Sequence, residues 1–95
     1  MSAGASVLAP EGELTMATAG PLLSEGQRRL AAGDLTVDFS AVSNVDSAAL
    51  ALILGWLRSA RGAGTRLTLR KLPAGVASLA ALYDLEALLP VESHA

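Results

Sequence analysis

The segment that most constrains the fold is residues 45–54, where an almost wholly apolar helix is predicted directly after a polar turn. An apolar stretch with strand-like alternation, residues 35–39, precedes that turn. Asp46 and Ser47 stand at the start of the helix, where a side-chain oxygen can accept hydrogen bonds from the free N–H groups of the first turn. Apolar residues cover more than one face of the helix, which indicates that it packs on a sheet and has a second contact elsewhere.

The N-terminal part predicts two short strands, Ser6–Leu8 and residues 13–17. Pro10, Glu11 and Gly12 between them are typical of a turn, so we expect a hairpin. A helix is expected to begin at Pro21, after the breaking sequence Ala-Gly-Pro, and to end at Gly33.

The second half continues the alternation of helix and strand. The apolar helix is expected over residues 46–61, and a strand over 66–70, with Leu67 and Leu69 facing the core. A last helix follows Pro73, with Tyr83 as a core residue, and a turn covers 84–90. This order predicts an α/β fold in one domain, residues 1–95, with a core over about 13–90 and peripheral ends that include 91–95. Helices are expected mostly on one face of a small sheet.

The composition excludes several classes of partner. Of the 95 residues 52% are hydrophobic, and the net charge of −2 argues against nucleic acid as a partner. No apolar run reaches the length needed to cross a bilayer, so we expect a cytoplasmic protein without direct membrane insertion. Five cationic residues lie in the second half of the sequence: Arg58, Arg61, Arg66, Arg70 and Lys71. They either lie in solvent at the ends of helices and strands, or form a basic face for an acidic partner.

Catalytic and cofactor motifs are not found in the sequence. His94 is the only histidine, and it is the penultimate residue of the sequence. A tail is not expected to hold a histidine in the fixed position that a general base needs. There is no cysteine, no glycine-rich phosphate loop, and no set of acids with the spacing of metal ligands. We therefore expect a non-enzymatic protein with no catalytic residue, no metal and no cofactor.

Two features invite a functional interpretation beside a structural one. Asp46 and Ser47 either cap the helix and do nothing more, or form a recognition or phosphorylation site. Trp56, the only tryptophan, is either a core residue or an anchor for a partner on an exposed face.

Residues 35–54, which contain the sequence Val-Asp-Ser-Ala-Ala-Leu, resemble the central signature of STAS domains, the fold of anti-sigma-factor antagonists. Gly-Trp-Leu-Arg at 55–58, Leu-Arg-Lys-Leu-Pro-Ala at 69–74 and Leu-Ala-Ala-Leu-Tyr at 79–83 are similar to the STAS subunits of Mla phospholipid-transport ABC complexes (MlaB-like). The resemblance implies the STAS fold, a small mixed β-sheet with helices mainly on one face.

The resemblance also implies an accessory subunit that binds and supports a transporter ATPase (MlaF-like) in complex with a permease. Such a complex would maintain the lipid asymmetry of the outer membrane, and the subunit would lie on the cytoplasmic side of the inner membrane. Ser47 falls at the family's partner surface, where antagonists carry the phosphorylated serine. Weak self-association of the isolated chain is also expected. The residues expected at the partner surface are Asp46, Ser47, Ala48, Ala49, Leu50, Leu52 and Trp56.

An alternative implied by the same resemblance is a phospho-regulated anti-sigma-factor antagonist in a partner-switching pathway. Antagonists usually carry glycine where this chain has Ala49, and the added methyl group is expected to hinder the close approach of a kinase. A small enzyme or a direct lipid carrier is the weakest alternative, because a chain of this size has little volume for a ligand cavity.

Overall fold

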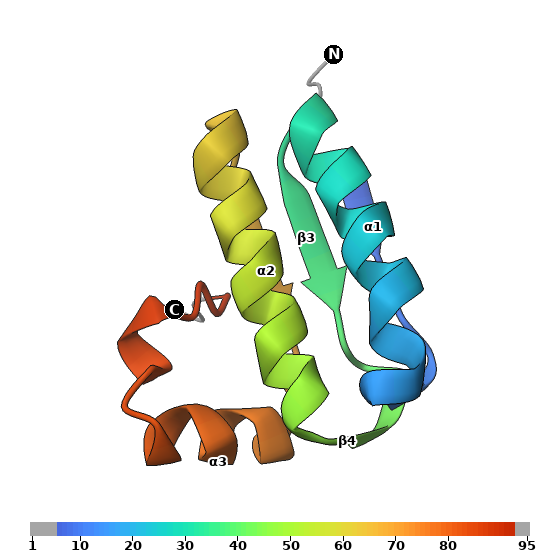
Figure 1. Cartoon of the computed structure of the whole chain (residues 1–95), viewed down its shortest axis with the longest axis vertical. Helices are drawn as coiled ribbons and strands as arrows, with labels where there is room; N and C mark the ends of the chain where they lie inside the picture. The colour runs from blue at the N-terminus through green and yellow to red at the C-terminus, as the bar shows by residue number, and fades with distance from the viewer. Residues whose placement is uncertain (1–5, 93–95) are drawn as a thin grey trace.

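The computed structural model describes residues 6–92. A three-stranded parallel sheet in the order β1-β3-β5 is formed by β1 (Ser6–Leu8), β3 (Leu35–Asp38) and β5 (Leu67–Arg70). A parallel pair, β2 (Gly12–Leu14) and β4 (Val42–Val45), continues from one end of this sheet. Helices α1 (Met16–Ala32) and α2 (Ser47–Ala63) lie side by side against one face of the sheet (Figure 1).

The smaller C-terminal elements lie beside α2. Helix α3 (Ala74–Leu82) starts beside the N-terminal end of α2 and runs away from it, and a 3₁₀ turn, η1 (Glu86–Leu88), follows it (Figure 1). The α/β class and the placement of the two long helices on one face are confirmed. All described strand pairs are parallel, where a mixed sheet was expected.

The sheet buries one face only. Leu35 and Val37 of β3 alternate with half-buried Thr36 and Asp38, and β5 repeats the pattern with Leu67 and Leu69 inside, as predicted. The register places Leu35 beside Leu67 and Val37 beside Leu69, so the buried leucine and valine side chains form one apolar surface under the helices.

The predicted N-terminal hairpin is wrong. β1 pairs with β3 and β2 pairs with β4, and both pairings are parallel. The turn at residues 9–11 therefore marks the point where the chain changes its partner strand rather than its direction. Residues 40–44 were interpreted as a polar turn, but residues 42–44 belong to β4. Among the described strands, β4 pairs with β2, and it leaves Ser43 and Asn44 exposed. Local composition does not report such long-range pairing.

Helix α1 begins at Met16, five residues before the predicted start. The N–H of Thr15 donates to Thr18 Oγ1 at 3.0 Å, and this hydroxyl donates to Glu13 O at 3.0 Å, so the two residues hold the chain at the turn from β2 into the helix. Pro21 lies inside the helix, where the missing N–H removes one backbone hydrogen bond near its N-terminal end. The predicted strand over 13–17 accordingly ends at Leu14.

Both chain ends of the described part add to the sheet, although we expected them to be peripheral. β1 is an outer strand next to β3, and Val91 forms a parallel bridge to Leu69 of β5. The backbone of Leu69 accepts from Glu92 N at 2.7 Å and donates to Pro90 O at 2.9 Å.

Tyr83, expected in the core, is 58% exposed at the C-terminal end of α3. His94 lies outside the described residues.

Gly26 of α1 lies directly against the side chain of Trp56 in α2. The indole ring is fully buried, and its Nε1 donates to Leu22 O at 3.2 Å. A Cβ atom on Gly26 would overlap the indole ring, so only glycine allows this approach of the two helices. Gly55 faces α1 in the same way, since a Cβ there would lie 2.9 Å from Leu23 Cδ1.

We expect Gly26→Ala to lower the free energy of unfolding by about 2 kcal/mol, because the added methyl group must displace a rigid, buried ring. Gly20→Ala is the matched control in the same helix, because its Cβ would meet no atom within 4 Å. The control should be neutral or gain up to about 1 kcal/mol from the better helix propensity of alanine. Urea denaturation measures both variants, and equal midpoints would contradict the Gly26–Trp56 contact.

Candidate functional site

Ser47 is the first residue of α2 and its side chain is exposed. One residue, Asp46, separates it from β4, and it lies at the end of the molecule where α1 and α2 both begin (Figure 1). The turn between β3 and β4 is set by Asp38, whose Oδ1 accepts from Ser40 N at 2.9 Å. This hydrogen bond lowers the pKa of the Asp38 carboxyl. The turn thus carries the chain out of β3 and into β4, and Asp46 and Ser47 follow that strand.

The carboxylate of Asp46 connects the starts of the two long helices. Oδ1 accepts from Ala48 N at 2.8 Å and caps α2, while Oδ2 accepts a longer bond from Met16 N at 3.4 Å at the start of α1. The backbone N–H of Asp46 donates to Leu14 O at 3.3 Å, which continues the contact with β2. Asp46 is therefore both a helix cap and a bridge between helices.

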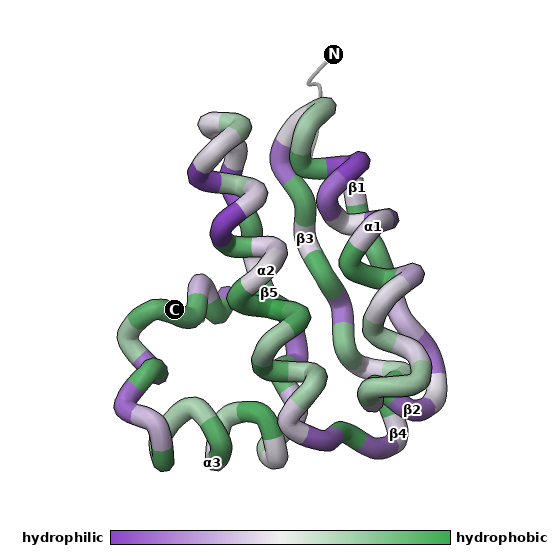
Figure 2. The backbone as a smooth tube through the Cα atoms, viewed as in Figure 1, coloured by the Kyte–Doolittle hydropathy of each residue, from purple (hydrophilic) through white to green (hydrophobic). Residues whose placement is uncertain are grey.

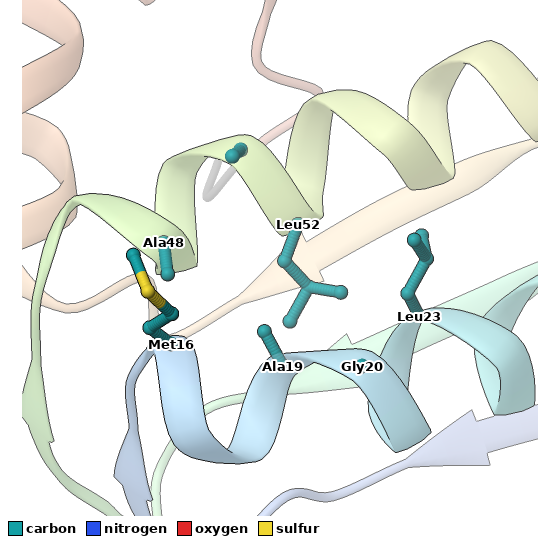
Figure 3. Close-up of a pocket in the computed structure, with 7 residues that line it drawn as sticks. Met16, Ala19, Gly20, Leu23, Ala48 and Leu52 are labelled. Atoms are coloured by element: carbon teal, nitrogen blue, oxygen red, sulfur yellow. The ribbon is translucent and has the colours of Figure 1, made fainter.

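An open apolar groove lies between these helix starts, beside Ser47. It has a volume of about 250 Å³. Figure 3 shows Met16, Ala19 and Leu23 on α1 facing Ala48 and Leu52 on α2. We call this the α1–α2 groove; its walls are completed by Gly20 and Ala51. Met16 is 81% exposed, so a large flexible apolar side chain stands at the edge of the groove next to the Ser47 region.

The structure divides the seven residues expected at the partner surface into two groups. Asp46 and Ser47 are exposed and Ala48 is half-buried, so these three form an accessible site. The other four belong to the buried core, so the expectation that their side chains meet a partner is corrected: Ala49, Leu50, Leu52 and Trp56. Leu52 still borders the floor of the α1–α2 groove.

The burial of Ala49 also corrects an argument from the sequence. Its methyl group is fully buried in the core, so it does not project toward a protein that approaches Ser47. The alanine in place of glycine therefore provides no steric argument against phosphorylation of Ser47.

The hydrogen bonds around Ser47 affect how it would accommodate a phosphate. The N–H groups of the first turn of a helix favour an anion. Here Asp46 already uses two of them, because Ala48 N donates to Oδ1 and Ala49 N donates to the Asp46 carbonyl oxygen at 3.0 Å. A phosphate on Ser47 would also lie next to the Asp46 carboxylate, which opposes its charge.

The sequence did not reveal the contribution of α1 to this site. Met16, Ala19, Gly20 and Leu23 were assigned to a strand, a break and a later helix. The available signal was Thr15 followed by Thr18, a capping pattern that places the start of the helix before Pro21.

The described residues contain neither a metal-ligand cluster nor a helix that could span a membrane. Within residues 6–92, no group of three or more metal-ligating side chains comes together. Every helix in that range is too short or too polar to cross a bilayer. The features that the site presents to a partner are the α1–α2 groove, the Ser47 hydroxyl and the Asp46 carboxylate.

Comparison with known proteins identifies the family. A family model described as "MlaB, STAS domain" matches residues 1–90. The chain belongs to the MlaB-type STAS domain family. Proteins with STAS domains generally regulate or assist other proteins and carry out no catalysis. A comparison with curated protein sequences found no match.

Solved structures agree with the fold of this MlaB-type STAS domain. It is similar to a Thermotoga maritima protein assigned as an anti-sigma factor antagonist, with a TM-score of 0.77 and 22% identity over 93% of this chain and 78% of the other. It is also similar to the anti-sigma factor antagonist SpoIIAA in its unphosphorylated form, with a TM-score of 0.72 and 16% identity over 99% and 86% of the two chains. These identities support the STAS fold alone.

We expect Asp46→Ala to lower the free energy of unfolding by about 1–2 kcal/mol, because the cap of α2 and the bond to Met16 N are both lost. Asp46→Asn should lose less, since an amide oxygen can still accept from Ala48 N. Urea denaturation of the two variants tests this, and a loss of equal size in both would show that the charge, rather than the cap, is what stabilises the site.

Proposed function

We propose that this MlaB-type STAS domain is a non-enzymatic accessory subunit of an ABC transporter for phospholipids, and that it binds the ATPase subunit of that transporter. In this role it would be cytoplasmic, and the complex with the ATPase and permease would hold it at the inner membrane. The transporter would maintain the lipid asymmetry of the outer membrane.

The observation that carries the proposal is the exposed Ser47 beside the α1–α2 groove in a chain of this family. A partner could place an apolar side chain in the groove and a polar group against the Ser47 hydroxyl. The site offers shape and one hydrogen-bonding group, which suits protein recognition better than chemistry. Weak self-association of the isolated chain through the groove is also expected.

The subunit would act through binding free energy. If it binds one arrangement of the ATPase more tightly than another, it raises the population of that arrangement without taking part in hydrolysis. The consequence is a change in ATPase assembly or turnover that depends on the subunit being bound.

The test is to co-express the full chain with the ABC ATPase and permease encoded nearest to it, and to measure co-purification and ATP hydrolysis. Ser47→Glu should abolish co-purification, because it places a charge at the centre of the contact. The fold should persist, since an acidic residue in the first turn of α2 is favoured by the helix dipole. Ser24→Glu, at an exposed serine of α1, is the matched control and should bind as the wild type.

Two outcomes would contradict the proposal in different ways. Normal co-purification of Ser47→Glu would remove Ser47 from the interface while leaving the transporter role in place. No binding of the wild-type chain to the ATPase would remove the transporter role itself.

The second candidate is a phospho-regulated anti-sigma-factor antagonist. It is favoured by the accessible Ser47 hydroxyl at the start of α2, and Ala49 does not obstruct that position. The Asp46 carboxylate next to it opposes a phosphate. Incubation with the kinase encoded nearest to the chain, followed by mass spectrometry, tests this role; phosphoserine at 47 and release of an anti-sigma factor would support it.

A further inference from the structure

One face of α2 lies at the edge of the core and outside the Ser47 site. Leu54, Leu57, Arg58 and Arg61 follow the spacing of a single helix face, with the leucines half-buried and the arginines exposed. Leu85 and Leu88, at η1, form the opposite wall. Together the six residues line a groove of about 250 Å³, which we call the α2–η1 groove. It is apolar toward the middle of α2 and cationic toward the C-terminal end of the helix.

The two arginines of this groove lack a counter-charge in the described part of the chain. Neither Arg58 nor Arg61 forms an ion pair within residues 6–92. Three other arginines are paired. Arg29 and Arg28 both hydrogen-bond to Glu25, which lowers the pKa of its carboxyl. Arg70 pairs with Glu92 at 3.3 Å. Arg66 and Lys71 also form no ion pair within this range, and neither lines the groove. Arg58 and Arg61 thus place two unpaired positive charges on one side of the groove, in a chain of net charge −2.

Exposed apolar side chains lie in the wall opposite α2 and in the segment that precedes it. Leu88 of the wall is 48% exposed, and Leu82 and Tyr83, which come before the wall in the chain, are 75% and 58% exposed. Figure 2 shows hydrophobic residues along α3 and the segment that follows it, outside the layer formed by α1, α2 and the sheet. Exposed apolar side chains that gather next to a groove are typical of a contact surface.

We propose that the α2–η1 groove docks an acidic amphipathic helix from a protein partner. Aliphatic side chains of that helix would fill the space between Leu57 and Leu88. Carboxylates on the next turn of the partner helix would pair with Arg58 and Arg61. These arginines lie three residues apart on one face of α2, so they match acidic residues that are three or four positions apart in the partner. The groove is remote from Ser47 along α2, so this proposal does not depend on the transporter role.

A protein helix fits these observations better than an anionic membrane. The site is concave and has room for a few aliphatic side chains, whereas a bilayer surface would need a convex apolar face with cations around it.

The test begins with a selection on the intact chain. A phage-displayed library of random peptides about 16 residues long, which span about 24 Å as a helix, is selected on the wild-type protein. Binders of the double variant Arg58→Glu/Arg61→Glu are removed. Enriched peptides should carry leucine or isoleucine at helical spacing with Asp or Glu on the adjoining turn. Addition of a synthesised peptide should shift the backbone amide NMR signals of Leu54, Leu57, Leu85 and Leu88.

Charge variants make the electrostatic part quantitative. Arg58→Glu and Arg61→Glu should each weaken the peptide by about tenfold in fluorescence anisotropy. Arg66→Glu is the matched control, with the same change of charge on an exposed arginine outside the groove, and should change the Kd by less than about twofold. A peptide with lysines in place of its acids should bind the double variant and not the wild type. Circular dichroism verifies that each variant is folded.

Several results would overturn the proposal. One is a selection that enriches no peptide, or only peptides that bind the Arg58→Glu/Arg61→Glu protein equally well. Another is amide shifts centred on the α1–α2 groove instead. Phosphatidylethanolamine–phosphatidylglycerol vesicles that shift the groove amides in the absence of peptide would assign the site to a membrane. Shifts of the same amides with protein concentration, with dimers in sedimentation, would assign it to a second copy of this chain.

Discussion

The contact of the Trp56 indole with the Gly26 backbone sets the distance between the two long helices. A buried ring of this size makes many dispersion contacts, and its N–H must find an acceptor, which is Leu22 O at 3.2 Å. Both conditions are met only because residue 26 has no side chain. Since α1 and α2 together cover the sheet, their separation also decides how Leu35, Val37, Leu67 and Leu69 are buried.

The α1–α2 groove is a consequence of the same packing at the other end of the helix pair. Next to Gly26 and Gly55 the helices are in close contact, whereas at their N-terminal ends small side chains such as Ala19 and Ala48 leave space between them. The Asp46 carboxylate bonds to N–H groups at both helix starts across this space. A conformational change at Ser47 would therefore be coupled to the start of α1 as well as to α2.

Helix α2 carries three surfaces with different physical character. Ile53, Trp56 and Ala60 face the core and provide stability. Its first residues carry the exposed hydroxyl proposed to meet the ATPase, and the stripe that ends in Arg58 and Arg61 is proposed to meet an acidic helix. Two partners on separate parts of one helix could bind together, because neither would cover the other's residues. Hydrophobic residues make up 52% of the chain, and they supply both the core and the two proposed docking surfaces.

The sequence by itself determined the α/β class, helices α2 and α3, strands β3 and β5, and Ser47 at a helix start. Each depends on spacing, capping or breaking residues within a few positions of one another. Only the tertiary structure decided that β1 and β2 pair with β3 and β4, that Trp56 is a core residue, and that Met16 joins Ala48 in a groove. Those outcomes depend on contacts between residues far apart in the chain. A local pattern shows that a residue will be buried or exposed, but not which distant surface will cover it.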